Sequence, residues 1–174
     1  MKYNPENIYV HISKLILDYI KFRKETIAKA KILLSFSGGI DSTVLADILI
    51  KMQKIYKFRI EFVHFNHGID TNSSLTEEAC IKYSKKYKIP LLVYKFNFHT
   101  MSNFECRARE KRYKIIDDLQ NKNKYTLVLT GHNKNDQIET LIMRSKNKSD
   151  WLSLIGIWKN INYIFRPMLD IYRS

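Results

Sequence analysis

The chain has 174 residues, of which 45% are hydrophobic and 27% charged, and its formal net charge at pH 7 is +13. This length and composition place it among globular proteins with one domain and a buried core. The positive charge favours an acidic partner such as nucleic acid or a nucleotide. AT-rich coding is a second explanation of the charge, because it enriches Lys, Ile, Asn and Tyr without selection for binding.

The two cysteines, Cys80 and Cys106, lie far apart and form no CxxC pair. This spacing argues against a disulfide framework, a zinc site and an iron–sulfur site, and it favours a protein of a reducing compartment. No apolar stretch is long enough to span a bilayer, and the N-terminus lacks the apolar core and cleavage site of a signal peptide. We expect a cytoplasmic protein without membrane contact, or one of an organelle stroma or matrix if an organelle genome encodes it.

The N-terminal thirty residues predict a helix that packs on the main domain. Asn4 is suited to the N-cap, with Pro5 and Glu6 in the first turn. Apolar residues then follow at helical spacing, at Ile8, Ile12, Leu15 and Tyr19.

Predicted strands and helices alternate along the remaining chain. The strands are expected at residues 31–36, 59–65, 91–98, 125–131 and 162–169. Of the helices, one presents Leu45, Ile48, Leu49 and Met52 on a single face, and one runs through Tyr87 after a capping box of Ser74 and Glu77. A charged helix covers residues 103–120, and a last one begins near Asn135. This alternation predicts an α/β fold, a parallel sheet with helices on both faces.

Polar residues follow three of the predicted strands, at residues 37–42, 64–68 and 131–139. The carboxyl ends of parallel strands meet at one edge of the sheet, and ligands bind there in open α/β folds. Exposed loops are polar in any case. The coincidence of three such loops at one edge predicts a functional site.

The first of these loops reads SGGIDS, from Ser37 to Ser42. A glycine pair and a helix N-terminus suit a phosphate, yet Asp41 places a carboxylate there. The carboxylate fits if Mg²⁺ joins it to phosphate oxygens, or if Asp41 is an ordinary first-turn acid. The chain has neither GxxxxGK[ST] nor GxGxxG, which argues against P-loop phosphate transfer and dinucleotide binding.

SGGIDS resembles the pyrophosphate-binding loop of the N-type ATP pyrophosphatases, the PP-loop superfamily. Three further stretches, in the same order, resemble the tRNA(Ile)-lysidine synthetase family: VHFNHGI (63–69), AREKRY (108–113) and GHNKNDQIET (131–140). Two shorter pieces, LIGI (154–157) and FRPML (165–169), are similar to later parts of that family's catalytic domain.

The resemblance implies a fold of the adenine nucleotide alpha hydrolase type and a ligase that converts ATP to AMP and pyrophosphate. Such an enzyme uses ATP, Mg²⁺ and L-lysine to modify C2 of the wobble cytidine in an isoleucine tRNA with a CAU anticodon. The reaction passes through an adenylated cytidine and forms lysidine, which changes codon reading from AUG to AUA. Residues 31–174 would be the catalytic domain, residues 1–30 an N-terminal helical segment, and no separate C-terminal tRNA-binding domain is expected.

The resemblance also implies roles for particular residues. ATP binding falls to Ser37, Gly38, Gly39, Ile40, Asp41 and Ser42, and Asp41 is the metal ligand. Catalytic roles fall to Asp41, Asp136, Glu139 and Arg109. Candidates for substrate or RNA contact are His67, Arg112 and His132.

Structural alternatives remain for these residues. Asp136 and Glu139 are three apart on a predicted helix, and this spacing also suits an acidic face exposed to solvent. The opposite face carries Ile138, Leu141 and Ile142, and we expect it to pack on the sheet. Arg109 is spaced to pair with Glu105, and His132 also suits a hydrogen-bonded loop.

The chain departs from the family pattern at a few positions. Ile69 and Asp70 stand where leucine and arginine are usual, Asn133 replaces the second histidine of a pair, and Asn135 replaces the first of two aspartates. The sequence also stops at Ser174, whereas many bacterial members carry C-terminal domains that hold the tRNA. A truncated chain and a naturally minimal form both fit this pattern.

Two other functions compete with this interpretation. A tRNA thiolase of the same superfamily commonly needs paired cysteines, which this chain lacks. A degenerate, non-catalytic nucleotide or RNA binder would not need the intact SGGIDS loop with Asp136 and Glu139.

Overall fold

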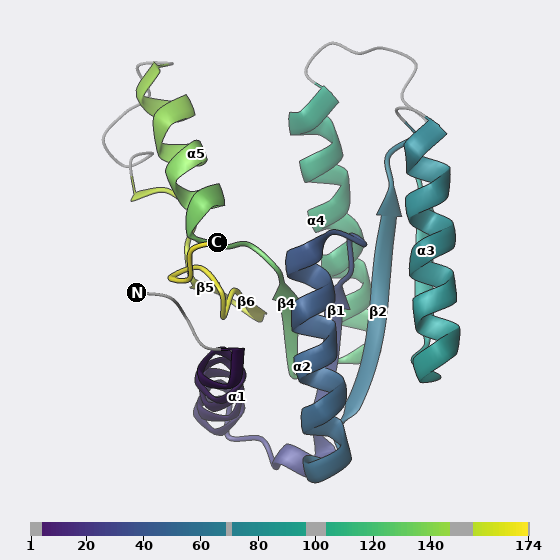
Figure 1. Ribbon diagram of the computed structural model, residues 1–174, viewed down its shortest axis with the longest axis vertical. Coiled ribbons are helices and arrows are strands. Elements are labelled where there is room, and N and C mark those ends of the chain that lie inside the picture. Colours follow the sequence, from purple (N-terminus) through teal and green to yellow (C-terminus); the bar gives the residue numbers. More distant parts are fainter. Residues whose placement is uncertain (1–4, 69–70, 97–103, 147–154, 174) are drawn as a thin grey trace.

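A six-stranded sheet forms the centre of the protein in a computed structural model that describes residues 5–68, 71–96, 104–146 and 155–173 (Figure 1). The strands are β1 (Lys31–Ser35), β2 (Arg59–Asn66), β3 (Leu91–Lys95), β4 (Leu127–Thr130), β5 (Asn160–Ile161) and β6 (Ile164–Phe165). Their order across the sheet is β3-β2-β1-β4-β6-β5, and only the β5–β6 pair is antiparallel. The predicted α/β class with a parallel sheet is confirmed.

The sheet order reverses between β1 and β4. The chain runs from β1 outward to β2 and β3, then returns to place β4 on the other side of β1. In open α/β sheets this reversal leaves a crevice outside the carboxyl ends of the two strands, where ligands bind. The loops that follow β1 and β4 therefore face a common crevice.

Alternation of side chains along the strands buries both faces of the sheet. Ile32 and Leu34 belong to one core cluster, while Leu33 between them belongs to another. The same period of two appears in β4, where Leu127 and Leu129 face the first cluster. Burial on both faces explains why these strands are continuous apolar runs.

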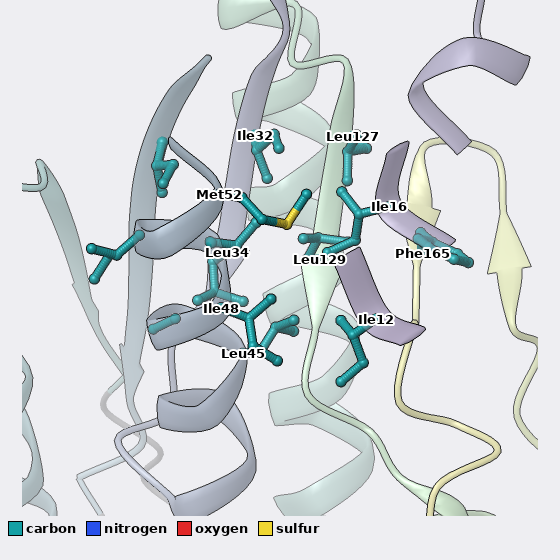
Figure 2. Packing of buried hydrophobic residues seen from close by; sticks show 14 of the residues in the cluster. Ile12, Ile16, Ile32, Leu34, Leu45, Ile48, Met52, Leu127, Leu129 and Phe165 are labelled. Carbon is teal, nitrogen blue, oxygen red and sulfur yellow. The ribbon is translucent and has the colours of Figure 1, made fainter. Parts of the chain in front are cut away.

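Helices α1 (Pro5–Phe22), α2 (Ile40–Tyr56) and α3 (Thr71–Tyr87) contribute to the first cluster. Figure 2 shows this packing with side chains from α1, α2 and the strands, among them Ile12, Ile16, Leu45, Met52, Leu34 and Leu129. Helix α4 (Phe104–Asn123) covers the other face with Ile116 and Leu119. The expected N-terminal helix is present, and a short 3₁₀ helix, η1 (Ile27–Lys29), leads from it to β1.

The predicted capping box of α3 is wrong. The helix begins at Thr71, so Ser74 lies inside its first turns. Glu77 accepts a hydrogen bond from Asn66 Nδ2 at 2.6 Å, and Lys95 Nζ lies 2.9 Å from its other oxygen. These partners at the ends of β2 and β3 hold the carboxylate that the capping box would have used.

The predicted last strand, 162–169, is also wrong in extent. The chain forms a hairpin of β5 and β6 with a two-residue turn, in which Asn162 has φ of 53°. Asparagine tolerates this left-handed conformation better than most residues do. After Phe165 the chain leaves the sheet through a turn over residues 167–170. Strand β3 ends at Lys95, and the remainder of its predicted range lies outside the described residues beyond Phe96.

Helix α5 (Lys134–Lys146) does not pack on the sheet as expected. Ile138 and Ile142 are 39% and 50% exposed, and the helix has no buried residue. Figure 1 shows α5 beside the sheet, close to the C-terminal end of the chain. Hydrogen bonds from backbone and side chains hold it, including Lys134 N to Ile171 O at 2.9 Å and Arg144 Nη1 to Gly156 O at 3.0 Å. Among the described helices, none has the length and apolar character needed to cross a membrane.

Candidate functional site

The loop between β1 and α2 carries the SGGIDS residues. Gly39 is the N-cap of α2, so Ile40 and Asp41 lie in the first turn of the helix. Gly38 has φ of +80°, and a Cβ there would lie 2.9 Å from both Cys80 Sγ and Thr76 Cγ2. Glycine is therefore required on grounds of conformation and of space. The loop presents a helix N-terminus to the crevice, which suits an anion.

Hydrogen bonds among the loop's own hydroxyls fix its shape. Ser37 Oγ donates to Ser42 Oγ at 3.0 Å, and Ser42 Oγ donates to Gly39 O at 2.9 Å. Gly39 N donates back to Ser37 Oγ at 3.3 Å. This closed set of contacts preorganises the backbone before any ligand arrives.

Strand β2 supports the loop from behind. The strand extends one residue beyond its predicted range and includes Asn66 as well as His64, and both side chains are buried. His64 Nδ1 is 2.9 Å from the Phe36 carbonyl oxygen, and Cys80 Sγ is 3.5 Å from the same nitrogen. Burial raises the pKa of the Cys80 thiol to about 11, so this cysteine is protonated and unreactive at neutral pH.

The end of β4 approaches the start of α2 closely. A Cβ at Gly131 would lie 3.0 Å from Ser42 N and 3.2 Å from Ser42 Cα. Gly131 thus allows the two loops of the crevice to touch through their backbones. The result is one continuous wall from Ser37 to His132.

The departures at Asn133 and Asn135 have a structural explanation. Asn133 is almost fully buried, and its Oδ1 accepts the backbone N–H groups of Asn135 at 2.7 Å and Asp136 at 3.2 Å. Asp136 Oδ2 in turn accepts the N–H of Asn133 at 2.7 Å. Asn133 is therefore the N-cap of α5 in a reciprocal capping arrangement. Asn135 Oδ1 accepts the N–H of Arg173 at 3.0 Å.

Two adjoining cavities lie over this wall. The first, about 190 Å³, is lined by Ser35, Ser37, Gly39, Asp41, Ser42, Arg112, Thr130, Gly131, His132 and Asp136. The second, about 220 Å³, is lined by Arg109, Arg112, Tyr113, His132, Asp136, Glu139, Thr140, Met143 and Ile157. Arg112, His132 and Asp136 line both. The structure therefore brings the phosphate-type loop together with residues of two other motifs, which are Arg109, Arg112, His132, Asp136 and Glu139.

Three of the named residues lie outside both linings. Gly38 and the exposed Ile40 belong to the loop itself but do not face the cavities. His67 packs its ring against Phe96 and Phe104, with ring centroids 5.4 and 6.1 Å away. Burial lowers the pKa of His67, and the nearby Arg112 and His64 lower it further. His67 is thus a half-buried residue behind the site.

Arg109 and Arg112 give the second cavity a positive wall. Their guanidinium carbons lie 5.8 and 6.0 Å from the ring centroid of Tyr113. Within the part of the chain that the structure describes, neither arginine forms an ion pair, so the alternative Glu105–Arg109 pair is not formed. Burial lowers the pKa of Arg112, yet its guanidinium remains charged at neutral pH. Two arginines without carboxylate partners suit an anionic ligand.

His132 is neutral in this environment. Burial is the main cause that lowers its pKa to about 4, with Arg166 and Arg112 adding to the effect and Asp136 opposing it. Its Nδ1 lies 2.7 Å from Thr130 Oγ1. A neutral imidazole at the junction of the two cavities offers one donor and one acceptor nitrogen.

Asp41 has a partner that the sequence did not predict. Arg173 Nη1 lies 3.7 Å from Asp41 Oδ2, and both side chains are partly exposed. No group of three or more His, Cys, Asp and Glu in the described residues is arranged to hold a metal ion. Mg²⁺ needs fewer protein ligands, because phosphates and water complete its shell. Asp41, whose carboxylate lines the first cavity, fits such an ion.

The chain is similar in sequence to one family model and to several known proteins. A model of the PP-loop domain matches residues 9–174. A tRNA(Ile)-lysidine synthase of Buchnera aphidicola subsp. Schizaphis graminum is 38% identical over 130 residues, which are 74% of this chain and 29% of that protein. The tRNA(Ile)-lysidine synthase of Clostridium perfringens strain 13 is 31% identical over 170 residues, 94% of this chain and 36% of that protein. The chain thus spans about a third of the length of these curated relatives.

A solved structure shows the same fold. The U34-tRNA thiolase NcsA from Methanococcus maripaludis, solved with its [4Fe-4S] cluster, superposes with a TM-score of 0.68 at 20% sequence identity. The match covers 92% of this chain and 61% of the thiolase. At this identity the likeness concerns the fold alone.

Proposed function

Because the chain belongs to the PP-loop family, we propose that it is an ATP-dependent tRNA ligase that joins L-lysine to C2 of the wobble cytidine of an isoleucine tRNA with a CAU anticodon. The similarity to two tRNA(Ile)-lysidine synthases supports this choice of substrates. The observation that carries it is the junction of two unlike cavities, one walled by the SGGIDS loop and one by Arg109, Tyr113 and Glu139.

The first cavity is suited to the nucleotide. In the first step the cytidine O2 attacks the α-phosphate of ATP, and pyrophosphate leaves with the electron pair of the broken P–O bond. Backbone N–H groups at the start of α2 stabilise the charge that develops on the pyrophosphate. Mg²⁺ held by Asp41 would neutralise phosphate charge, as this ion does in other nucleotide sites.

The second cavity is suited to the cytidine and the lysine. Arg109 and Arg112 hold the phosphate of the adenylated base, for which the planar guanidinium is well shaped. In the second step the lysine ε-amine attacks C2, and AMP leaves with O2. The carboxylates of Asp136 and Glu139 attract the ammonium group and accept the proton that the amine loses. Neutral His132, at the junction, orients either substrate by hydrogen bonds.

The thiolase alternative is less well supported. An iron–sulfur cluster requires several cysteine thiolates, and this chain has two cysteines. Cys80 is buried behind the loop, and Cys106 is exposed on α4. The similarity to the solved thiolase therefore supports a shared fold, and it does not extend to the chemistry of the thiolase's iron–sulfur cluster.

The proposal is tested by following labelled lysine. The protein is incubated with a CAU-anticodon tRNA transcript, ATP, Mg²⁺ and radiolabelled L-lysine, omitting each component in turn. We expect ATP-dependent label in the tRNA and pyrophosphate release that requires the tRNA. Glu139→Gln, which keeps the side-chain size, should lose most of the lysine transfer, and a transcript with uridine at the wobble position is the matched RNA control. Label transferred from cysteine sulfur and none from lysine would move this chain to the thiolases.

A further inference from the structure

A third cavity adjoins the second one on the side of the β5–β6 hairpin, and we call it the hairpin pocket. Its volume is about 360 Å³, and its lining includes Arg109, Arg144, Trp158, Tyr163 and Arg166. Arg109, Tyr113 and Ile157 line both this pocket and the second cavity. A ligand that occupies the second cavity could therefore continue into the hairpin pocket.

A buried arginine gives the hairpin pocket its character. Arg166 is 3% exposed, donates from Nη2 to Tyr113 Oη at 2.9 Å, and donates from Nη1 to the Trp158 carbonyl oxygen at 2.6 Å. Its Nε is buried and finds no hydrogen-bond partner among the described residues. Within those residues it also has no carboxylate partner. A buried cation without a counterion is costly, so this arrangement points to an anionic ligand.

The remaining charges of the pocket are mostly positive. Arg109 and Arg144 also line it, and Arg144 donates to Gly156 O at 3.0 Å. Asp117 is the acid in the lining, and its carboxylate accepts a hydrogen bond from Tyr163 Oη. Among the described lining residues, three guanidinium groups against one carboxylate favour phosphate over an ammonium group.

Aromatic residues also line the hairpin pocket. Trp158 is 57% exposed, while its backbone is fixed by the hydrogen bond from Arg166. Tyr113 and Tyr163 line the same space. In RNA-binding proteins, unpaired bases stack on exposed aromatic rings, and neighbouring arginines bind the phosphates.

We propose that the hairpin pocket binds an unpaired nucleotide of the RNA substrate adjacent to the nucleotide that is modified. Its base stacks on Trp158, and its phosphate lies among Arg109, Arg144 and Arg166. This inference rests on the proposed function, because it requires an RNA substrate whose target base lies in the second cavity.

Tryptophan fluorescence tests the proposal directly. The chain has two tryptophans, so Trp151→Phe leaves Trp158 as the only indole. Titration of this variant with an anticodon stem–loop RNA should quench and shift the Trp158 emission in a saturable way. A stem–loop that binds with unchanged emission overturns the proposal. Quenching by L-lysine without RNA also overturns it, since it assigns the pocket to the amino acid.

Affinity measurements on variants supply the second test. We expect Trp158→Ala to weaken stem–loop binding by about tenfold or more, the effect of losing one stacked base. Trp158→Phe should retain most of the affinity, and Phe22→Ala, which removes an exposed ring on α1, is the matched control. ATP affinity should stay the same in all three. If Trp158→Ala binds the RNA as tightly as wild type does, the assignment of the hairpin pocket is wrong while the proposed function stands. If the wild-type protein binds no RNA, the proposed function is wrong as well.

Discussion

At the scale of single residues, Asp41 has two partners to explain, the proposed Mg²⁺ and Arg173. An exposed ion pair contributes about 1 kcal/mol or less, so the contact with Arg173 cannot account for a large effect on the reaction. We expect Asp41→Asn to lower the rate of tRNA-dependent pyrophosphate release by about 10²-fold or more, the loss typical of one electrostatic stabiliser. Asp18→Asn, at an exposed position on α1, is the matched control.

Arg173→Ala separates the two explanations of Asp41. If the carboxylate acts through the metal, this variant should keep near wild-type pyrophosphate release. Equal losses in Asp41→Asn and Arg173→Ala would mean that the ion pair is what matters.

His132 gives a prediction about pH. Its pKa is lowered to about 4 in the folded protein, mainly by burial, whereas an unfolded histidine titrates near 6.5. Between these values the unfolded state binds more protons, so stability is fully present above about pH 6.5 and falls as the pH drops toward 4. Urea denaturation of His132→Asn should show a smaller loss of unfolding free energy across this window, by up to about 3 kcal/mol. The exposed His11→Asn is the control, and an unchanged pH dependence in His132→Asn contradicts the account.

The sequence predicts which residues share a helix face better than it predicts their partners. Motif spacing places Asp136 and Glu139 on one face of a helix, and the structure shows that this face lines one cavity together with Arg109 and Arg112 of α4. Arg166 could not be assigned to the pocket in this way, because its contacts with Tyr113 and Trp158 depend on how distant segments meet.

At the scale of elements, the start of α5 depends on Asn133. Its side chain satisfies two N–H groups of the first turn, and it is buried. Asn133→Ala should lower the free energy of unfolding by about 1 to 2 kcal/mol, measured by urea denaturation. Asn133→Asp should keep most of the stability, because aspartate is an equally good N-cap. Asn121→Ala, at an exposed position of α4, is the matched control, and an Asn133→Ala protein as stable as wild type contradicts the capping role.

Helices and strands with a clear period could be predicted, and short or irregular elements could not. The apolar runs of β1 and β4 and the faces of α1 and α2 match their predicted positions. The β5–β6 hairpin escaped prediction because strands of two residues carry no period. Ile138 and Ile142 suggested a buried face of α5, but hydrogen bonds at both ends hold this helix away from the sheet.

At the scale of the whole molecule, the net charge of +13 should govern RNA binding. Four basic residues of α4 form the expected contact surface, Arg107, Arg109, Lys111 and Arg112, and two of them, Arg109 and Arg112, line the second cavity. If these four side chains meet phosphates, log affinity should fall with log salt concentration with a slope of about −3. Filter binding of an anticodon stem–loop at several salt concentrations measures it. A flat dependence would show that charge does not drive this binding and that coding bias accounts for the composition.

The fold class could be predicted because it follows from the order of elements. The same order predicts the edge of the sheet at which the candidate site lies. The division into residues 1–30 and 31–174 stays a prediction. Ile12, Ile16 and Ile20 of α1 lie in the same buried cluster as β1 and α2, so the N-terminal helix shares the main core.

The carboxylate of Asp136 links ligand binding to the integrity of α5. Its Oδ2 accepts the N–H of Asn133, while the side chain also lines both cavities of the site. A ligand that draws this oxygen away must compensate a hydrogen bond of about 1 kcal/mol. Thermodynamic reciprocity then requires the converse, so a looser first turn of α5 frees the carboxylate and tightens the ligand. For such a ligand, occupancy of the crevice and fraying of the N-terminal end of α5 are coupled as two sides of a single equilibrium.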